Sequence, residues 1–65
     1  MPRFFTQTIS DKTGTIVGDD AKHIARVLRM KVGDMLTACD TKGFDYDCQI
    51  ECLSDKEVQL KVLRV

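Results

Sequence analysis

Hydrophobic and polar residues alternate most regularly between positions 44 and 52 of this 65-residue chain. An alternation with period two is typical of a strand that turns one face to a core and the other to water. We therefore predict one long strand here, with an acidic outer face and every apolar side chain inside. Those apolar residues are Phe44, Tyr46, Cys48, Ile50 and Cys52.

Shorter runs of β-branched and alternating residues predict the remaining strands, at about residues 3–9, 15–17, 35–39 and 58–62. Polar turn segments at 10–14, 40–43 and 53–56 separate them. Adjacent residues of a strand point to opposite faces, so one of Phe4 and Phe5 belongs to the core and the other packs elsewhere. The inward residues of the later strands are Leu36, Ala38, Val58, Leu60 and Val62.

Helical periodicity occurs only between Asp19 and Met30. Its apolar positions recur at i, i+3, i+4 and i+7, and they predict one buried helix face over about residues 20–29. Asp19 or Asp20 suits the N-cap, where a carboxylate accepts the free N–H groups of the first turn. The predicted buried face consists of Ala21, Ile24, Ala25 and Leu28.

Five or six short strands with one short α-helix, at turn spacings of about ten residues, predict a mainly β fold that closes into a small barrel. Closure removes the exposed strand edges that an open sheet would leave. A chain of 65 residues forms one domain at most and buries only a modest core. The pattern by itself does not separate a PUA-like barrel from an SH3-like or an OB-like one.

A second face of the predicted helix is basic. Lys22, Arg26 and Arg29 recur at i, i+4 and i+7, and Lys31 follows them. Cations without intervening acids repel one another, which favours an anion-binding face over a merely solvated one, although both interpretations remain open. Either arginine has a structural alternative, which is an ion pair with an acidic residue of the barrel, for example Asp34 or Asp40.

Two further residues border this basic face. Arg3 can project near it from the first strand, and its alternative is an ordinary exposed arginine. His23 lies three residues before Arg26, where it either packs against the core or stacks on a nucleic-acid base. The sequence does not decide between these two roles.

The charge is balanced overall but unevenly distributed. Residues 1–31 carry six basic and three acidic residues, a net charge of +3, whereas residues 32–65 carry four basic and seven acidic residues, a net charge of −3. A zero total argues against extensive binding to nucleic acid, whereas the polarity predicts one basic face on a divided surface.

The chain shows no sequence pattern of catalysis or metal binding. Cys39, Cys48 and Cys52 have no C-x-x-C spacing, and His23 is the only histidine, so we expect small core side chains rather than a zinc site. No nucleophile–base pair and no phosphate-cradling glycine loop is found. The first residues resemble no signal peptide and no apolar run spans a membrane, so we expect a cytoplasmic protein.

One string of residues resembles a known family, the N-terminal domain of the ribosomal RNA small subunit methyltransferase E family. The resemblance covers nearly the whole chain. It implies a small PUA-like β-barrel over residues 1–65 that helps to hold rRNA. The matching segments are Pro2-Arg3-Phe4-Phe5, His23-Ile24-x-Arg26-Val27-Leu28-Arg29-Met30 and Gly33-Asp34.

In that family a separate C-terminal domain with a knotted fold binds S-adenosylmethionine and methylates N3 of a uridine near the decoding centre. The resemblance thus implies that this chain positions small-subunit rRNA, without a cofactor of its own, for a catalytic domain that these residues do not include. It also implies a homodimeric parent and leaves open whether the isolated domain is a monomer. The residues expected to contact RNA are Arg3, Lys22, His23, Arg26, Arg29 and Lys31.

The alternative is a structural or protein-interaction barrel that docks a partner domain without touching RNA. Leu63 and Val65 break the alternation of the last strand and fall on its outer face. We expect these two side chains to pack against something beyond the barrel, in the family its C-terminal domain. The two roles are compatible, because an RNA-binding face and a docking face can lie on opposite sides.

Overall fold

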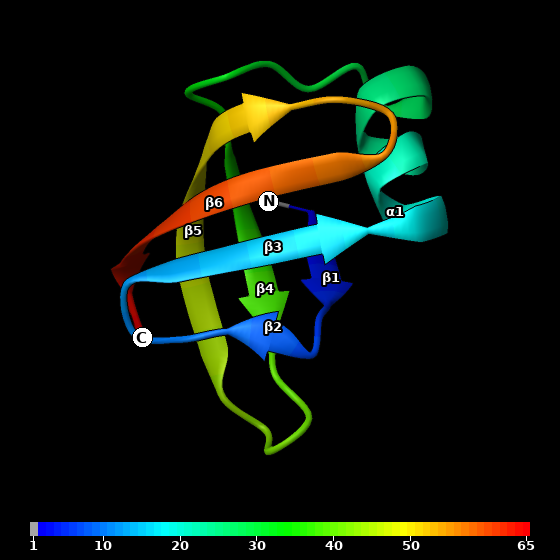
Figure 1. The fold of residues 1–65 in the computed structure, drawn as a ribbon. Coiled ribbons are helices and arrows are strands. Elements are labelled where there is room, and N and C mark those ends of the chain that lie inside the picture. Colours follow the sequence, from blue (N-terminus) through cyan, green and yellow to red (C-terminus); the bar gives the residue numbers. More distant parts are fainter. Residues whose placement is uncertain (1) are drawn as a thin grey trace.

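A computed structural model describes residues 2–65, and most of its elements are β-strands. The helical segment joins two of these strands and lies beside the barrel (Figure 1). In chain order the elements are β1 (Arg3–Phe5), β2 (Thr8–Ile9), β3 (Thr13–Val17), α1 (Gly18–Lys22), the π-helical turn η1 (His23–Val27), β4 (Met35–Cys39), β5 (Asp45–Leu53) and β6 (Glu57–Arg64).

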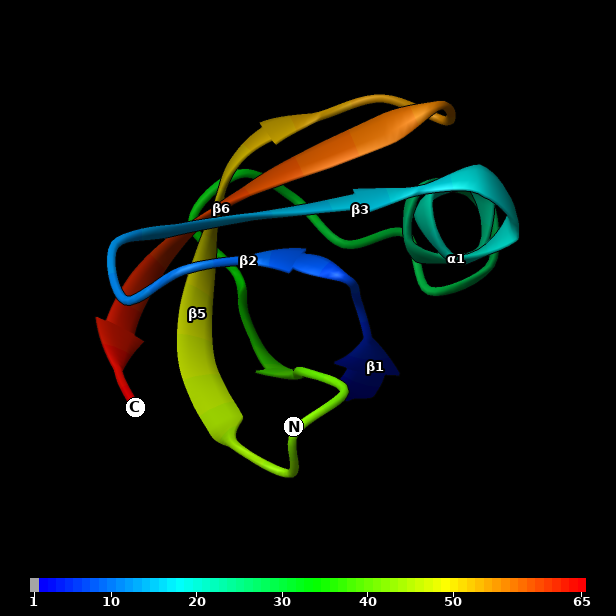
Figure 2. The same cartoon turned by 60° about the horizontal axis from the view of Figure 1, so that its bottom comes forward.

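All six strands belong to one sheet with the order β1-β4-β5-β6-β3-β2. β1 pairs in parallel with β4, and every other neighbouring pair is antiparallel. The sheet curls so that its strands surround a common centre, with the helical segment on one flank (Figure 2). This architecture confirms the predicted mainly β fold of five or six strands with one short helix, and the curled sheet forms a half-barrel.

Thr6 joins the two edges of the curled sheet. It lies between β1 and β2, which are the two edge strands. Its backbone N–H donates to the carbonyl of Cys39 in β4 at 3.0 Å, and its hydroxyl donates to the carbonyl of Thr15 in β3 at 2.6 Å. The predicted first strand is therefore split at Thr6, because the chain changes partner there from one side of the barrel to the other.

The core lies inside the curled sheet and beneath the helical segment. Its buried residues come from strands β3 to β6 and from the helical segment, and they include every inward residue predicted for 35–39 and the first two predicted for 58–62. Val62 is partly buried against the same cluster. The core cluster consists of Ile16, Ala21, Ile24, Leu36, Ala38, Cys48, Ile50, Val58 and Leu60.

The helical segment differs from the regular α-helix predicted for 20–29. It begins at Gly18, whose φ is +69°, and it widens after Lys22 into η1. Leu28 N–H donates to the carbonyl of His23 at 3.0 Å, which is the i to i−5 bond of a π-helix. A π turn advances the chain less per residue, so residues after it lose the 3.6-residue phase.

The change of phase makes one core prediction wrong. Leu28 was expected on the buried face, but its side chain is 40% exposed. Met30 packs against the core instead, and its N–H donates to the carbonyl of Ile24 at 3.1 Å, which closes the end of the helical segment. Ala21 before η1 and Ile24 within it are buried as predicted, and Ala25 is half-buried.

β5 departs from strict alternation at both of its ends. A register shift between Ile50 and Cys52 lets two residues of β5 span one step of β6. Cys52 is therefore exposed rather than buried, and Leu53 packs against the core in its place. The prediction for Phe44 is also wrong, because Phe44 precedes β5 and is 56% exposed.

Candidate nucleic-acid interface

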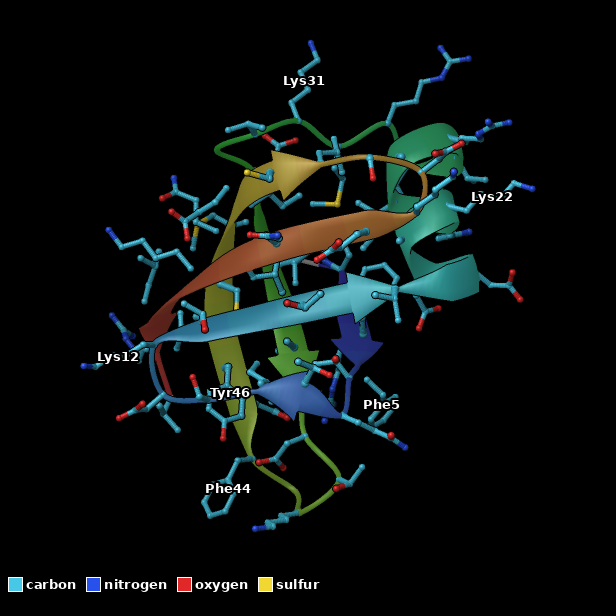
Figure 3. The ribbon with its side chains drawn as sticks, viewed as in Figure 1. Phe5, Lys12, Lys22, Lys31, Phe44 and Tyr46 are labelled. Carbon is cyan, nitrogen blue, oxygen red and sulfur yellow. The ribbon has the colours of Figure 1, made fainter. Side chains whose placement is uncertain are left out.

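Four of the six predicted site residues form the surface that we call the basic surface. It consists of Lys22, Arg26, Arg29 and Lys31, on the helical segment and the chain that follows it. All four side chains are exposed. Lys22 projects away from the barrel and Lys31 extends from the segment before β4 (Figure 3). The structure thus brings these four cations to one flank of the molecule.

Arg26 is paired within the protein. Its guanidinium donates to the carboxylate of Asp55 at 2.6 Å, and both side chains are substantially exposed. The hydrogen bond and the charge of Arg26 lower the pKa of the Asp55 carboxyl below its ordinary value. An exposed ion pair contributes little to stability, so its main effect is to hold Arg26 toward the β5–β6 turn.

The structural alternative predicted for the arginines is thus right for Arg26 but with a different partner. Asp34 accepts from the N–H of Lys31 at 2.8 Å and forms the turn before β4. Asp40 accepts from the N–H groups of Lys42 and Phe44 at 2.8 and 2.9 Å, which organises the β4–β5 loop. These backbone hydrogen bonds also lower the pKa of Asp40. Neither carboxylate pairs with an arginine.

Arg29 has a backbone conformation that is unusual for its residue type. Its φ is +52°, which is the left-handed region where glycine is favoured, and it is the only non-glycine residue of 2–65 with a positive φ. No ion pair of Arg29 is found among these residues. A strained backbone position that carries a long exposed cation points to a role for the side chain outside the fold.

His23 lies on the side of the helical segment that faces β1. Its ring is exposed but meets the ring of Phe4 in a T-shaped arrangement, with 6.4 Å between centroids. Both alternatives that the sequence left open thus have a basis, because one side of the ring packs and the other is accessible. Arg26 instead contacts Asp55, so His23 and Arg26 have different neighbours.

Arg3 is held by β4 and β5 rather than by the helix. Its guanidinium donates to Asp45 at 3.0 Å and to the sulfur of Cys39 at 2.8 Å. Cys39 is buried beneath it, and this burial raises the pKa of the thiol. Arg3 and His23 nevertheless line one groove together, between β1 and α1.

The sequence could not reveal the partners of these arginines. Asp55 lies 29 residues from Arg26 and Asp45 lies 42 residues from Arg3, and only the sheet register brings them together. The exposure of Phe5 did have a signal, since one of two adjacent strand residues must point outward. Phe4 is the one that packs against the core.

Other kinds of site were sought in the part of the chain that the structure describes. In residues 2–65 no group of three or more His, Cys, Asp or Glu side chains is arranged to hold a metal ion. No helix of these residues has the length and apolarity needed to cross a membrane. The grooves on this part of the surface are open depressions. None of these four grooves encloses a ligand as cofactor pockets do.

Comparison with known proteins identifies relatives of this barrel. The ribosomal RNA small subunit methyltransferase E of Bacillus subtilis (strain 168) is 29% identical over 68 aligned residues, which cover 97% of this chain and 27% of the relative. A crystal structure of a probable rRNA-methyltransferase from Porphyromonas gingivalis is 38% identical, with a TM-score of 0.74, over 95% of this chain and 26% of that one.

A third protein shares the fold at lower identity. It is a ribosomal RNA small subunit methyltransferase E from Neisseria gonorrhoeae bound to S-adenosyl methionine, 24% identical with a TM-score of 0.78, over 98% of this chain and 27% of that one. The chain thus spans only 26–27% of the length of these three relatives. The sequence model of the RNA methyltransferase PUA domain matches residues 16–63. This match covers most of the barrel, and the chain therefore belongs to the family of RNA methyltransferase PUA domains.

Proposed function

We propose that this chain is the RNA-binding domain of an rRNA methyltransferase and that its basic surface holds small-subunit rRNA for the catalytic part of the parent protein. The observation that carries the proposal is the backbone of Arg29. This position would suit glycine, yet it holds an arginine whose side chain has no ion-pair partner in residues 2–65. Arginine donates two parallel hydrogen bonds to phosphate oxygens, and that recognition needs an accessible guanidinium.

The members of the basic surface have different parts in this proposal. Lys22 and Lys31 are compact charges that add salt-dependent affinity for phosphates. Arg26 is held by Asp55 and contributes a positioned guanidinium at the edge of the contact. With three or four phosphate contacts, we expect weak binding, with a dissociation constant of about 10⁻⁴–10⁻⁶ M near physiological salt.

The activity of the parent is proposed from its relatives. Family membership and the curated Bacillus subtilis relative support an enzyme that acts on small-subunit rRNA, and the Neisseria gonorrhoeae protein with the same fold binds S-adenosyl methionine. We infer that a further domain of the parent uses S-adenosylmethionine to methylate N3 of a uridine. A homodimeric parent in the cytoplasm completes this proposal.

Two variants with the same loss of charge test the RNA-binding proposal. The first neutralises three of the four cations of the basic surface and leaves Arg26 in place. The second neutralises three exposed lysines elsewhere, of which Lys12 lies at the far side of the molecule from Lys22 (Figure 3). Fluorescence anisotropy with a labelled small-subunit rRNA hairpin gives the affinity at several salt concentrations. The test variant is Lys22→Gln/Arg29→Gln/Lys31→Gln, and the control is Lys12→Gln/Lys42→Gln/Lys61→Gln.

The proposal predicts that only the test variant loses affinity, by at least about tenfold at low salt. The slope of log K against log salt should fall by about 2–3, because each duplex phosphate contact contributes about 0.9. Equal losses in the two triple variants would mean that net charge, and not this surface, determines binding. Unchanged affinity in the test variant would reject the basic surface as the RNA site.

A second candidate function has an observation of its own. Leu63 near the end of β6 and Val65 just after that strand are 49% and 62% exposed. This agrees with the predicted outward direction of both side chains and favours a docking role toward the rest of the parent. In the full-length parent, docking through these residues should be insensitive to salt and should be weakened by Leu63→Ser. Equal exposure of Leu63 in the isolated domain and the parent would refute it.

A further inference from the structure

A groove of about 390 Å³ lies between β1 and the start of the helical segment. It combines exposed aromatic rings with charged groups of both signs. None of the four cations of the basic surface lines this groove. The groove is lined by Arg3, Phe4, Phe5, Asp19, Asp20 and His23.

The aromatic part of the groove offers rings to a ligand. Phe5 is 70% exposed, the highest value among the large apolar side chains of the described residues. The guanidinium carbon of Arg3 lies 6.0 Å from the centroid of its ring, and the exposed ring of His23 belongs to the same groove. Rings and guanidinium planes of this kind stack on unpaired RNA bases.

The acidic part of the groove has acceptors without donors. Asp19 and Asp20 were expected to cap the helix, but this prediction is wrong, because the N-cap residue is Val17 and no side-chain cap hydrogen bond forms. Both residues are exposed, and among residues 2–65 no hydrogen bond or ion pair to either carboxylate is found. The two carboxylates therefore remain available to donors from a ligand.

We propose that this groove binds a single unstacked RNA base that carries hydrogen-bond donors on its pairing edge, with guanine as the preferred base. Guanine presents an N1–H and an N2 amino group side by side, which match the two oxygens of one carboxylate. Uracil presents one N–H between two carbonyl oxygens, which carboxylates repel. A phosphate is disfavoured for the same electrostatic reason. The proposal rests on the RNA-binding function proposed above and adds the class of base that is recognised.

Pentanucleotides that differ at one base test this assignment. The probes are the single strands UUGUU, UUAUU, UUCUU and UUUUU, titrated into the 65-residue chain while amide chemical shifts are recorded. We expect UUGUU to bind about tenfold more tightly than UUUUU, which is the discrimination of one good bidentate contact. UUAUU and UUCUU, with one amino group each, should bind with intermediate affinity. The shifts should cluster at Phe5, Asp20 and His23.

Variants separate the two parts of the groove. Asp19→Asn/Asp20→Asn should bring the ratio of UUGUU to UUUUU affinity close to one, without weakening UUUUU. Phe5→Leu should weaken all four pentanucleotides at least fivefold, since stacking on an aromatic ring is lost. Phe44→Leu is the matched control, because Phe44 is also exposed but lies at the β4–β5 loop, apart from Phe5 (Figure 3). It should change nothing.

Two outcomes would overturn the assignment. One is binding of UUUUU, UUAUU or UUCUU as tight as that of UUGUU, and the other is a guanine preference that survives Asp19→Asn/Asp20→Asn. If the rRNA hairpin still binds through the basic surface in either case, the groove assignment fails and the RNA-binding function stands. If neither the hairpin nor any pentanucleotide binds, both proposals fail, and a protein partner becomes the better candidate for the groove.

Discussion

Replacing Arg29 by glycine separates the needs of the fold from the needs of RNA binding. Arg29 has a φ of +52°, just after the π-helical turn, and its side chain has no ion-pair partner among residues 2–65. Glycine adopts this conformation without a steric penalty. We therefore expect Arg29→Gly to maintain or raise the stability of the barrel while it weakens binding to rRNA.

The size of the effect follows from the backbone. A left-handed conformation costs an L-residue with a Cβ about 1–2 kcal/mol. Glycine loses about 0.5–1 kcal/mol more conformational free energy than alanine on folding, which offsets part of the gain. The net expectation is a rise of about 0–1.5 kcal/mol in the free energy of unfolding. For a domain of this size each kcal/mol raises Tm by roughly 4–8 °C.

Arg26→Gly is the matched control for this substitution. Arg26 lies within the helical segment, in η1, where a glycine costs about 1 kcal/mol. Urea unfolding followed by circular dichroism should thus move the two Arg→Gly variants in opposite directions. A destabilisation of Arg29→Gly equal to that of Arg26→Gly would refute the reasoning, since it would show that the Arg29 side chain supports the barrel.

Three further results are expected. Cys52 should react with a thiol reagent in the folded protein, whereas Cys39 and Cys48, whose burial raises their thiol pKa, should react only after unfolding. Reaction of all three thiols at one rate would contradict the burial of Cys39 and Cys48. The pKa of Asp40 is lowered in the fold, so the stabilisation that its carboxylate provides should be present above its ordinary pKa of 3.8 and be lost as the pH falls through the folded value. Asp40→Asn should therefore make the free energy of unfolding depend less on pH in the acid range. Thr6→Val should lower the free energy of unfolding by about 1 kcal/mol, since a hydrogen bond that closes the barrel is lost, and an unchanged urea midpoint would contradict that role.

The sequence predicts this fold well wherever one periodicity continues without interruption. The inward positions Leu36 and Ala38 of β4, and those at the start of β6, follow from alternation, although Cys39 at the end of β4 is buried as well. Predictions fail where an irregularity of the backbone shifts the periodicity of a strand or helix. The register shift after Ile50 exposes Cys52, and the π-helical turn exposes Leu28 and moves Met30 inward. Neither irregularity has a glycine or proline to mark it in the sequence.

The candidate site was predictable in its charges but not in its pairing. The spacing of Lys22, Arg26 and Arg29 placed cations on one exposed segment, as the structure has them. The sequence could not show that Arg26 is held by Asp55, because sheet register and turn geometry determine that distance. It also could not show the left-handed backbone of Arg29, which follows from the widened helical turn before it.

The most direct test of the central claim is an amide chemical-shift titration of this 65-residue chain with a small-subunit rRNA hairpin, at low and then at moderate salt. The RNA-binding account predicts shifts concentrated between Lys22 and Lys31 that fade as salt rises, because phosphate contacts release counterions. Shifts confined to the far side of the barrel, around Lys12 and the β4–β5 loop, would contradict it. So would the absence of any shift at low salt with both this chain and the full-length parent.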